Sequence, residues 1–280
     1  MSAFVPPVPP TFVGNATQPP AGSVVDASNG EFIAITDPSA NANDPTVIIA
    51  PDSGLITVSS ATEGADIIIE GGGDAVIEIG NAVDAAGNVL GASGSTFQVD
   101  NDYEGTVIVN LDGAICDSAV DIETETSTGT IADALPGSGK YADQDYEYYI
   151  NTGAGNDQIE GSQCEDFIRA GAGDDVVNAG AGDDLVRLGS GDDLVTLGDG
   201  NDAVYFTVDQ LQGEQGKVIT DFDAEGGDDK ILIDENLQDL VTIDGLGSNA
   251  ITIILDGAQT GITDVLSEGN TIDADDVEFV

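Results

Sequence analysis

Six consecutive nine-residue units between Thr152 and Tyr205 constrain the fold of this chain more than any other feature of its sequence. No insertion interrupts their register. Every unit has an aspartate at its sixth position and an aliphatic residue two positions later. A strict repeat of this length predicts that each unit is one structural element and that the units stack.

Each unit divides into a glycine-rich turn and a short strand whose aliphatic side chain points inward. One unit cannot bury that side chain alone, so the array is predicted to coil into a parallel β-roll with two units per coil. Alternate units then stack on the same edge of the roll. This stacking places Asp157, Asp175 and Asp193 along one edge, and Asp166, Asp184 and Asp202 along the other.

The turns combine the ligand types that calcium prefers. Calcium takes six to eight oxygen ligands and accepts backbone carbonyls together with carboxylates. Glycine lets the turn adopt positive φ and brings its carbonyls together. With two gaps between stacked turns on each edge, about four ions are expected. The predicted metal-binding residues are Gly153, Gly155, Asp157, Asp166, Gly171, Gly173, Asp175, Gly180, Gly182, Asp184, Gly189, Gly191, Asp193, Gly198, Gly200 and Asp202.

These units resemble the nonapeptide GGxGxDxUx of the RTX (repeats-in-toxin) calcium-binding family. Five of them keep the glycines at positions two and four, the aspartate and the aliphatic residue, while Thr, Ala or Leu mostly replaces the first glycine. The second unit departs further, because Ser162 and Cys164 stand at the glycine positions. The site that pairs Asp166 with Asp184 is therefore in question. The resemblance implies calcium as the bound ion.

Two segments after the repeats extend this resemblance. Residues 218–234 (VITDFDAEGGDDKILID) are similar to the stretch that caps the roll in many RTX proteins. Residues 276–280 (DVEFV) resemble the uncleaved C-terminal signal of type I secretion substrates, which implies an extracellular or cell-surface location. For the acidic residues of the first segment, a solvated loop is favoured over a further ion site. These residues are Asp221, Asp223, Asp228 and Asp229.

The charge balance excludes several partners. There are 53 acidic and five basic residues, which gives a formal net charge of -48, although 40% of the residues are hydrophobic. A folded chain this acidic repels itself unless cations neutralise it. Nucleic acids and anionic membranes both require a basic face, so neither is an expected partner. No run approaches the roughly 18 apolar residues that span a membrane.

The composition divides the chain into four predicted segments. Residues 1–24 form a proline-rich extended arm, residues 25–140 a β-rich domain, residues 141–207 the roll, and residues 208–280 a β-rich C-terminal cap with the secretion signal. The predicted fold is all-β, and the N-terminal domain is either a β-sandwich or an irregular β-solenoid. Its predicted strands are 31–36, 46–49, 55–59, 65–70, 74–79, 96–99 and 106–110.

Smaller features of the sequence leave alternatives open. Cys116 and Cys164, the only cysteines, form either one disulfide or two buried thiols. The tyrosines just before the repeats cover the open end of the roll or form a contact surface, and the first reading is favoured. They are Tyr146, Tyr148 and Tyr149.

No enzymatic activity is expected from this sequence. The chain contains no histidine, so it lacks the residue that HExxH zinc proteases and Ser-His-Asp or Cys-His sites require. It also lacks a GxSxG motif and tryptophan. We expect a secreted, non-catalytic structural subunit of a surface layer or fibre that self-associates with calcium. The alternative is an adhesin-like module carried by an RTX folding domain.

Overall fold

The computed structural model describes residues 24–26, 32–35, 46–49, 53–60, 66–70, 74–81, 95–99, 105–111, 146–207, 216–222, 228–255, 262–267 and 271–280. Within these ranges the chain is built of β-strands joined by turns, with two one-turn 3-10 helices, η3 (Glu235–Leu237) and η4 (Ala274–Asp276). The predicted all-β class is therefore confirmed.

The strands form two sheets. The first sheet contains, in spatial order, β1 (Val24–Asp26), β3 (Thr46–Ile49), β5 (Asp66–Glu70), β7 (Ser95–Val99), β9 (Tyr148–Asn151), β11 (Asp166–Ala172), β13 (Leu185–Ser190), β15 (Ala203–Phe206), β17 (Lys230–Ile233) and β21 (Val277–Phe279). The second contains β2 (Phe32–Ile35), β4 (Ser53–Ser60), β6 (Asp74–Asn81), β8 (Val107–Asn110), β10 (Gln158–Glu160), β12 (Val176–Ala181), β14 (Asp193–Asp199), β16 (Gly216–Phe222), β20 (Ile262–Ser267), β19 (Ala250–Leu255) and β18 (Val241–Asp244).

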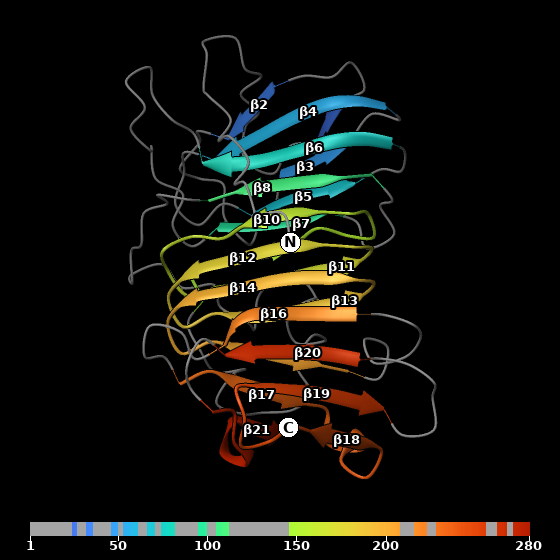
Figure 1. Cartoon of the computed structure of the whole chain (residues 1–280). Helices are drawn as coiled ribbons and strands as arrows, with labels where there is room; N and C mark the ends of the chain where they lie inside the picture. Colours follow the sequence, from blue (N-terminus) through green and yellow to red (C-terminus); the bar gives the residue numbers. More distant parts are fainter. Residues whose placement is uncertain are drawn as a thin grey trace.

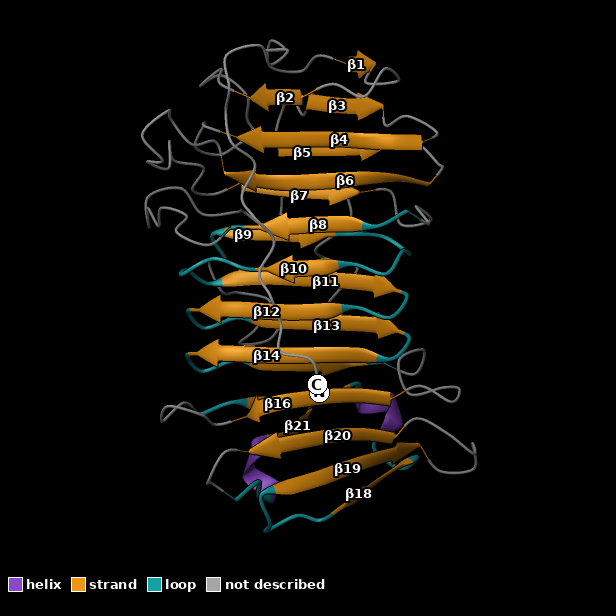
Figure 2. Ribbon diagram, turned by 45° about the horizontal axis from the view of Figure 1, so that its top comes forward, coloured by secondary structure: helices purple, strands orange, loops and turns teal. Residues whose placement is uncertain are grey.

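From β1 to β17, successive strands alternate between the two sheets, and neighbours within a sheet run parallel. Figures 1 and 2 show the resulting stack of coils, in which the strands of one sheet point opposite to those of the other. In the repeats, Ile159 pairs with Val177 and Val177 with Val195, one coil apart each time. The predicted parallel β-roll with two units per coil is confirmed.

The N-terminal strands follow the solenoid alternative rather than the sandwich. All seven predicted strands are present as β2 to β8, with bounds shifted by at most two residues. They stack in the same two parallel sheets as the repeats, and β8 pairs directly with β10. The sheets are therefore continuous from the N-terminal coils into the roll.

The core lies between the two sheets. Along each repeat strand the aliphatic residue at position eight points inward and is buried, as the two-residue period of a strand requires. The same layer continues into the N-terminal coils through residues such as Ile77, Ile79 and Val109. In the repeats the layer consists of Ile159, Ile168, Val177, Val186, Val195 and Val204.

The three tyrosines before the repeats are buried, so they form no contact surface. Because β9 pairs with β7 as well as with β11, these residues do not cover an open end either. Tyr148 joins the core between the sheets, while the rings of Tyr146 and Tyr149 pack 5.7 and 5.2 Å from the ring of Phe167.

The last coils change the pairing pattern. Strands β18, β19 and β20 are antiparallel, and they extend the second sheet beyond β16. Residues 277–279, within the predicted secretion signal, form β21 and pair with β17. The described part of the chain contains no helix long and apolar enough to cross a membrane. Residues 1–23, which cover nearly all of the predicted arm, and Asp223 lie outside the described ranges.

Candidate metal centre

The repeat aspartates form two buried columns, one on each edge of the roll. We call them the Asp157 column (Asp157, Asp175 and Asp193) and the Asp166 column (Asp166, Asp184 and Asp202). Each of the six is at most 2% exposed. The structure thus brings the predicted carboxylates together in the two predicted sets.

Backbone hydrogen bonds hold each column in register. In the Asp157 column, the Asp157 N–H donates to Asp175 Oδ1 at 2.9 Å, and the Asp175 N–H donates to Asp193 Oδ1 at 3.0 Å. The Asp166 column repeats this bond at 2.8 Å from Asp166 to Asp184 and from Asp184 to Asp202. One carboxylate oxygen of each receiving aspartate is therefore satisfied by the preceding coil.

A second, exposed ladder runs beside each column through position five of the units. Here the polarity reverses, because the N–H of the later coil donates to the side chain of the earlier one. The Asp174 N–H donates to Asn156 Oδ1 at 3.0 Å, and the Asp192 N–H donates to Asp174 Oδ1 at 3.0 Å. On the other edge, the Asn201 N–H donates to Asp183 Oδ1 at 2.9 Å. Adjacent turns are thus tied from both sides.

The second carboxylate oxygen distinguishes four aspartates from the other two. The Oδ2 atoms of Asp157, Asp175, Asp184 and Asp202 are buried and have no hydrogen-bond partner in the structure. A buried charged oxygen without a partner is strongly destabilising, so we expect a bound cation to satisfy each of these atoms. No three acidic or cysteine side chains converge on a metal position among the described residues, so an ion there must also draw on backbone carbonyls.

Burial raises the pKa of these carboxyl groups. The pKa of Asp157 and of Asp202 rises to about 7, chiefly because burial penalises the charged form. Burial likewise raises the pKa of Asp166 to about 8 and that of Asp175 to about 9, and neighbouring carboxylates add to the rise. The pKa of Asp184 is also well above its ordinary value for the same reasons. Without a cation, the columns therefore resist ionisation.

Turn glycines allow the coils to approach closely. Gly171 and Gly189 adopt φ of +103° and +96°, which side chains rarely tolerate. A Cβ at Gly189 would overlap the carbonyl oxygen of Gly171, one coil away. Glycine at this position is required by the stacking as well as by the turn.

The second unit, whose departure from the repeat put its site in question, satisfies its aspartate internally. The Ser162 hydroxyl donates to Asp166 Oδ1 at 2.8 Å, and the Ser162 N–H donates to Asp166 Oδ2 at 2.6 Å. Cys164 is buried and disulfide-bonded. Cys116, the other cysteine of the sequence, lies outside the described residues.

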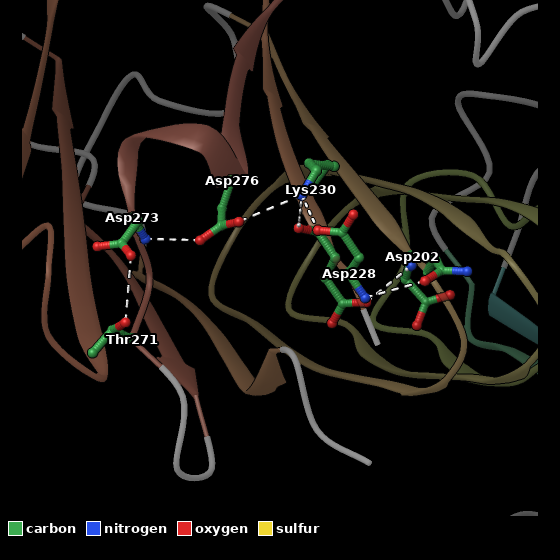
Figure 3. Close-up of polar contacts among 8 residues, drawn as sticks. Asp202, Asp228, Lys230, Thr271, Asp273 and Asp276 are labelled. Atoms are coloured by element: carbon green, nitrogen blue, oxygen red, sulfur yellow. Dashed lines mark hydrogen bonds and ion pairs between the residues drawn. The ribbon is translucent and has the colours of Figure 1, made fainter. Parts of the chain in front are cut away.

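Asp229 continues the Asp166 column beyond the repeats, which the sequence interpretation did not recognise. Asp229 is 2% exposed, and its Oδ1 accepts the Asp202 N–H at 2.9 Å, as within the repeats. The favoured solvated-loop reading is therefore wrong for this residue, although Asp228 is exposed. Figure 3 shows Asp228 and Lys230 beside Asp202 at this end of the column. The spacing of Asp229 and Ile231 was the available signal, because it repeats positions six and eight of a unit.

Asp221 has a different role from the columns. Its Oδ1 accepts the Leu197 N–H at 2.8 Å and its Oδ2 accepts the Gly198 N–H at 3.0 Å. Asp221 therefore links β16 to the end of β14 through backbone donors.

The fold and the two columns define a calcium-binding parallel β-roll. The family profile of the RTX calcium-binding nonapeptide repeat, four copies long, matches residues 149–177 and 169–204. The chain therefore carries RTX nonapeptide repeats, and these repeats bind calcium ions. Comparison with curated proteins and with solved structures gives no match.

Proposed function

We propose that this protein is a secreted, non-catalytic structural subunit of a cell surface or matrix, which calcium folds and then assembles. The observation that carries the proposal is the continuous two-sheet solenoid, in which calcium-binding coils are built directly onto coils without repeats. Such solenoids are quasi-one-dimensional, so they provide long repetitive sides and two ends suited to assembly.

The ends of the solenoid support contacts between copies. Among the described residues, β1 and β2 are the last strands of their sheets at the N-terminal end, and each has one neighbour. An edge strand offers backbone donors and acceptors to another chain. The proposed assembly uses such edges.

Charge explains why assembly would need calcium. At a formal net charge of -48, two copies repel each other strongly. About four internal ions would still leave a charge of roughly -40. The proposal therefore requires further calcium ions that bridge carboxylates of different copies.

Light scattering and negative-stain microscopy of the purified full chain test this proposal. Scattering should rise in millimolar calcium and fall again on chelation, and ordered sheets or filaments should be visible. Sodium chloride at matched ionic strength is the control, because it screens charge without bridging carboxylates. A protein that stays monomeric in calcium contradicts assembly, and binding to a glycan or surface partner by that monomer would favour the adhesin alternative.

A further inference from the structure

One buried lysine lies on the Asp157 column, directly after the last repeat aspartate. Lys217 of β16 pairs in register with Asp193 of β14, so it occupies the place that the next aspartate of the column would take. Its side chain is fully buried. It is the only buried lysine or arginine among the described residues.

The ammonium group of Lys217 meets two oxygens of the preceding turn. Nζ lies 2.8 Å from Asp193 Oδ2 and 2.9 Å from the carbonyl oxygen of Gly191. A repeat carboxylate and a turn-glycine carbonyl are the two ligand types predicted for calcium in this array. This contact also explains why Asp193 differs from Asp157 and Asp175, whose Oδ2 atoms have no partner.

We propose that the Lys217 ammonium is a resident cation that takes the place of calcium in the gap that follows Asp193, and so ends calcium binding on that edge. A lysine supplies one positive charge and three donors on a tether that is part of the chain. The Asp193 carboxylate is therefore neutralised as soon as β16 docks on β14, whatever the calcium concentration.

The two edges of the roll consequently differ. Calcium is confined on the first edge to the gaps between Asp157, Asp175 and Asp193. On the other edge the column runs one coil further, because Asp229 accepts the Asp202 N–H in the manner of a repeat aspartate. In the coil after the repeats, the position of the column aspartate is thus occupied by Lys217 on one edge and by Asp229 on the other.

Lys230 provides a matched comparison. It lies at the same level of the stack in the other sheet, where it begins β17. Its Nζ contacts Asp228 and lies 3.4 Å from Asp276, and Figure 3 shows it between these two residues. Its Nζ also donates to the backbone carbonyl oxygen of Asp229 at 3.3 Å. None of these acceptors is the carboxylate of a column aspartate, so Lys230 is not expected to affect the calcium count.

The test compares Lys217→Met with Lys230→Met in the full chain, because methionine keeps the aliphatic bulk and removes the charge. Native mass spectrometry in saturating calcium should find one more ion in K217M than in the wild type, and no extra ion in K230M. The calcium midpoint of folding, followed by circular dichroism, should rise by about threefold or more in K217M, because the folded state loses a cation that the chain had supplied. An unchanged ion count in K217M, or an extra ion in both variants, overturns the proposal.

A measurement on the wild type keeps the proposal testable if K217M does not fold. Long-wavelength anomalous scattering from calcium-soaked crystals locates each ion directly. The proposal requires no calcium peak between the turns of Asp193 and Lys217, with Nζ still on Asp193. A calcium peak there, with the lysine displaced, overturns it.

Discussion

At the scale of single residues, the six repeat aspartates fall into three groups according to what their second carboxylate oxygen meets. In four of them this oxygen has no partner, in Asp166 it accepts from Ser162, and in Asp193 it accepts from Lys217. Sites built from the same repeat motif thus differ in how much they require calcium to satisfy the second carboxylate oxygen. The inequality comes from Ser162, which replaces a consensus glycine in the turn of Asp166 itself, and from Lys217, which follows the array.

Replacing Asp184 or Asp166 by asparagine tests this inequality, because asparagine keeps the Oδ1 acceptor and removes the charge. Asp184→Asn should raise the calcium midpoint of folding by about tenfold, since it removes the ligand whose oxygen has no protein partner. Asp166→Asn should raise it by less than about threefold, because Ser162 already satisfies that carboxylate. Titrations monitored by circular dichroism measure both shifts. Equal shifts would contradict the assignment.

The raised pKa values predict how the metal-free roll responds to acid. A carboxyl group whose pKa is higher in the folded state binds protons on folding, so its contribution to stability is present at low pH and is lost as pH rises through the folded pKa. With folded values of about 7 for Asp157 and about 9 for Asp175, this loss extends through neutral pH. In calcium-free buffer, circular dichroism should therefore show more β-structure near pH 5 than near pH 9. More β-structure at the alkaline end would contradict the prediction.

The six aspartates and their division between two edges could be predicted from the sequence because a nine-residue period determines both. Lys217 and Asp229 could not be assigned in this way. The segment between Tyr205 and Asp229 breaks the period, so the distance along the chain no longer says which coil a residue joins. The stacking partner is set by sheet pairing, which a sequence without a period does not specify.

At the scale of turns and strands, close stacking makes some glycines irreplaceable. Gly189→Ala should lower the free energy of unfolding in calcium by more than about 2 kcal/mol, because the φ is positive and the new Cβ would overlap a backbone carbonyl of the adjacent coil. Gly216→Ala is the control, since the nearest atom to its Cβ would be Asp192 Oδ1 at 3.8 Å. Urea unfolding of both variants measures the difference. A loss at Gly216 as large as that at Gly189 would contradict the stacking argument.

The N-terminal strands show what local pattern can and cannot determine. Their β-branched runs predicted seven strands at nearly the observed positions. The runs did not separate a sandwich from a solenoid, because both bury one face of every strand. What distinguishes the solenoid from a sandwich is the parallel, in-register pairing of strands one coil apart, such as Ile79 with Val109. Those contacts are long-range, and no motif in that segment marks them.

At the scale of the whole molecule, calcium removal should unfold the roll. Chelation of the full chain should reduce the β-signal in circular dichroism, and calcium should restore it, because binding energy contributes directly to folding. Hydrogen exchange should locate the loss of protection in residues 152–205. Magnesium at the same concentration is the control, since it demands stricter octahedral geometry and gives up its water reluctantly. An unchanged spectrum in chelator would contradict calcium-dependent folding.

The direct pairing of β8 with β10 also bears on the order of events when calcium becomes available. The Val107 N–H already donates to Asp157 Oδ1 at 2.8 Å, so the first repeat turn rests on a coil that has no repeat aspartate of its own. In a one-dimensional array, the first unit to form bears the cost of nucleation, and later units need only add to a neighbour. We therefore expect the N-terminal coils to nucleate the roll, and ion binding to extend along the array from that end.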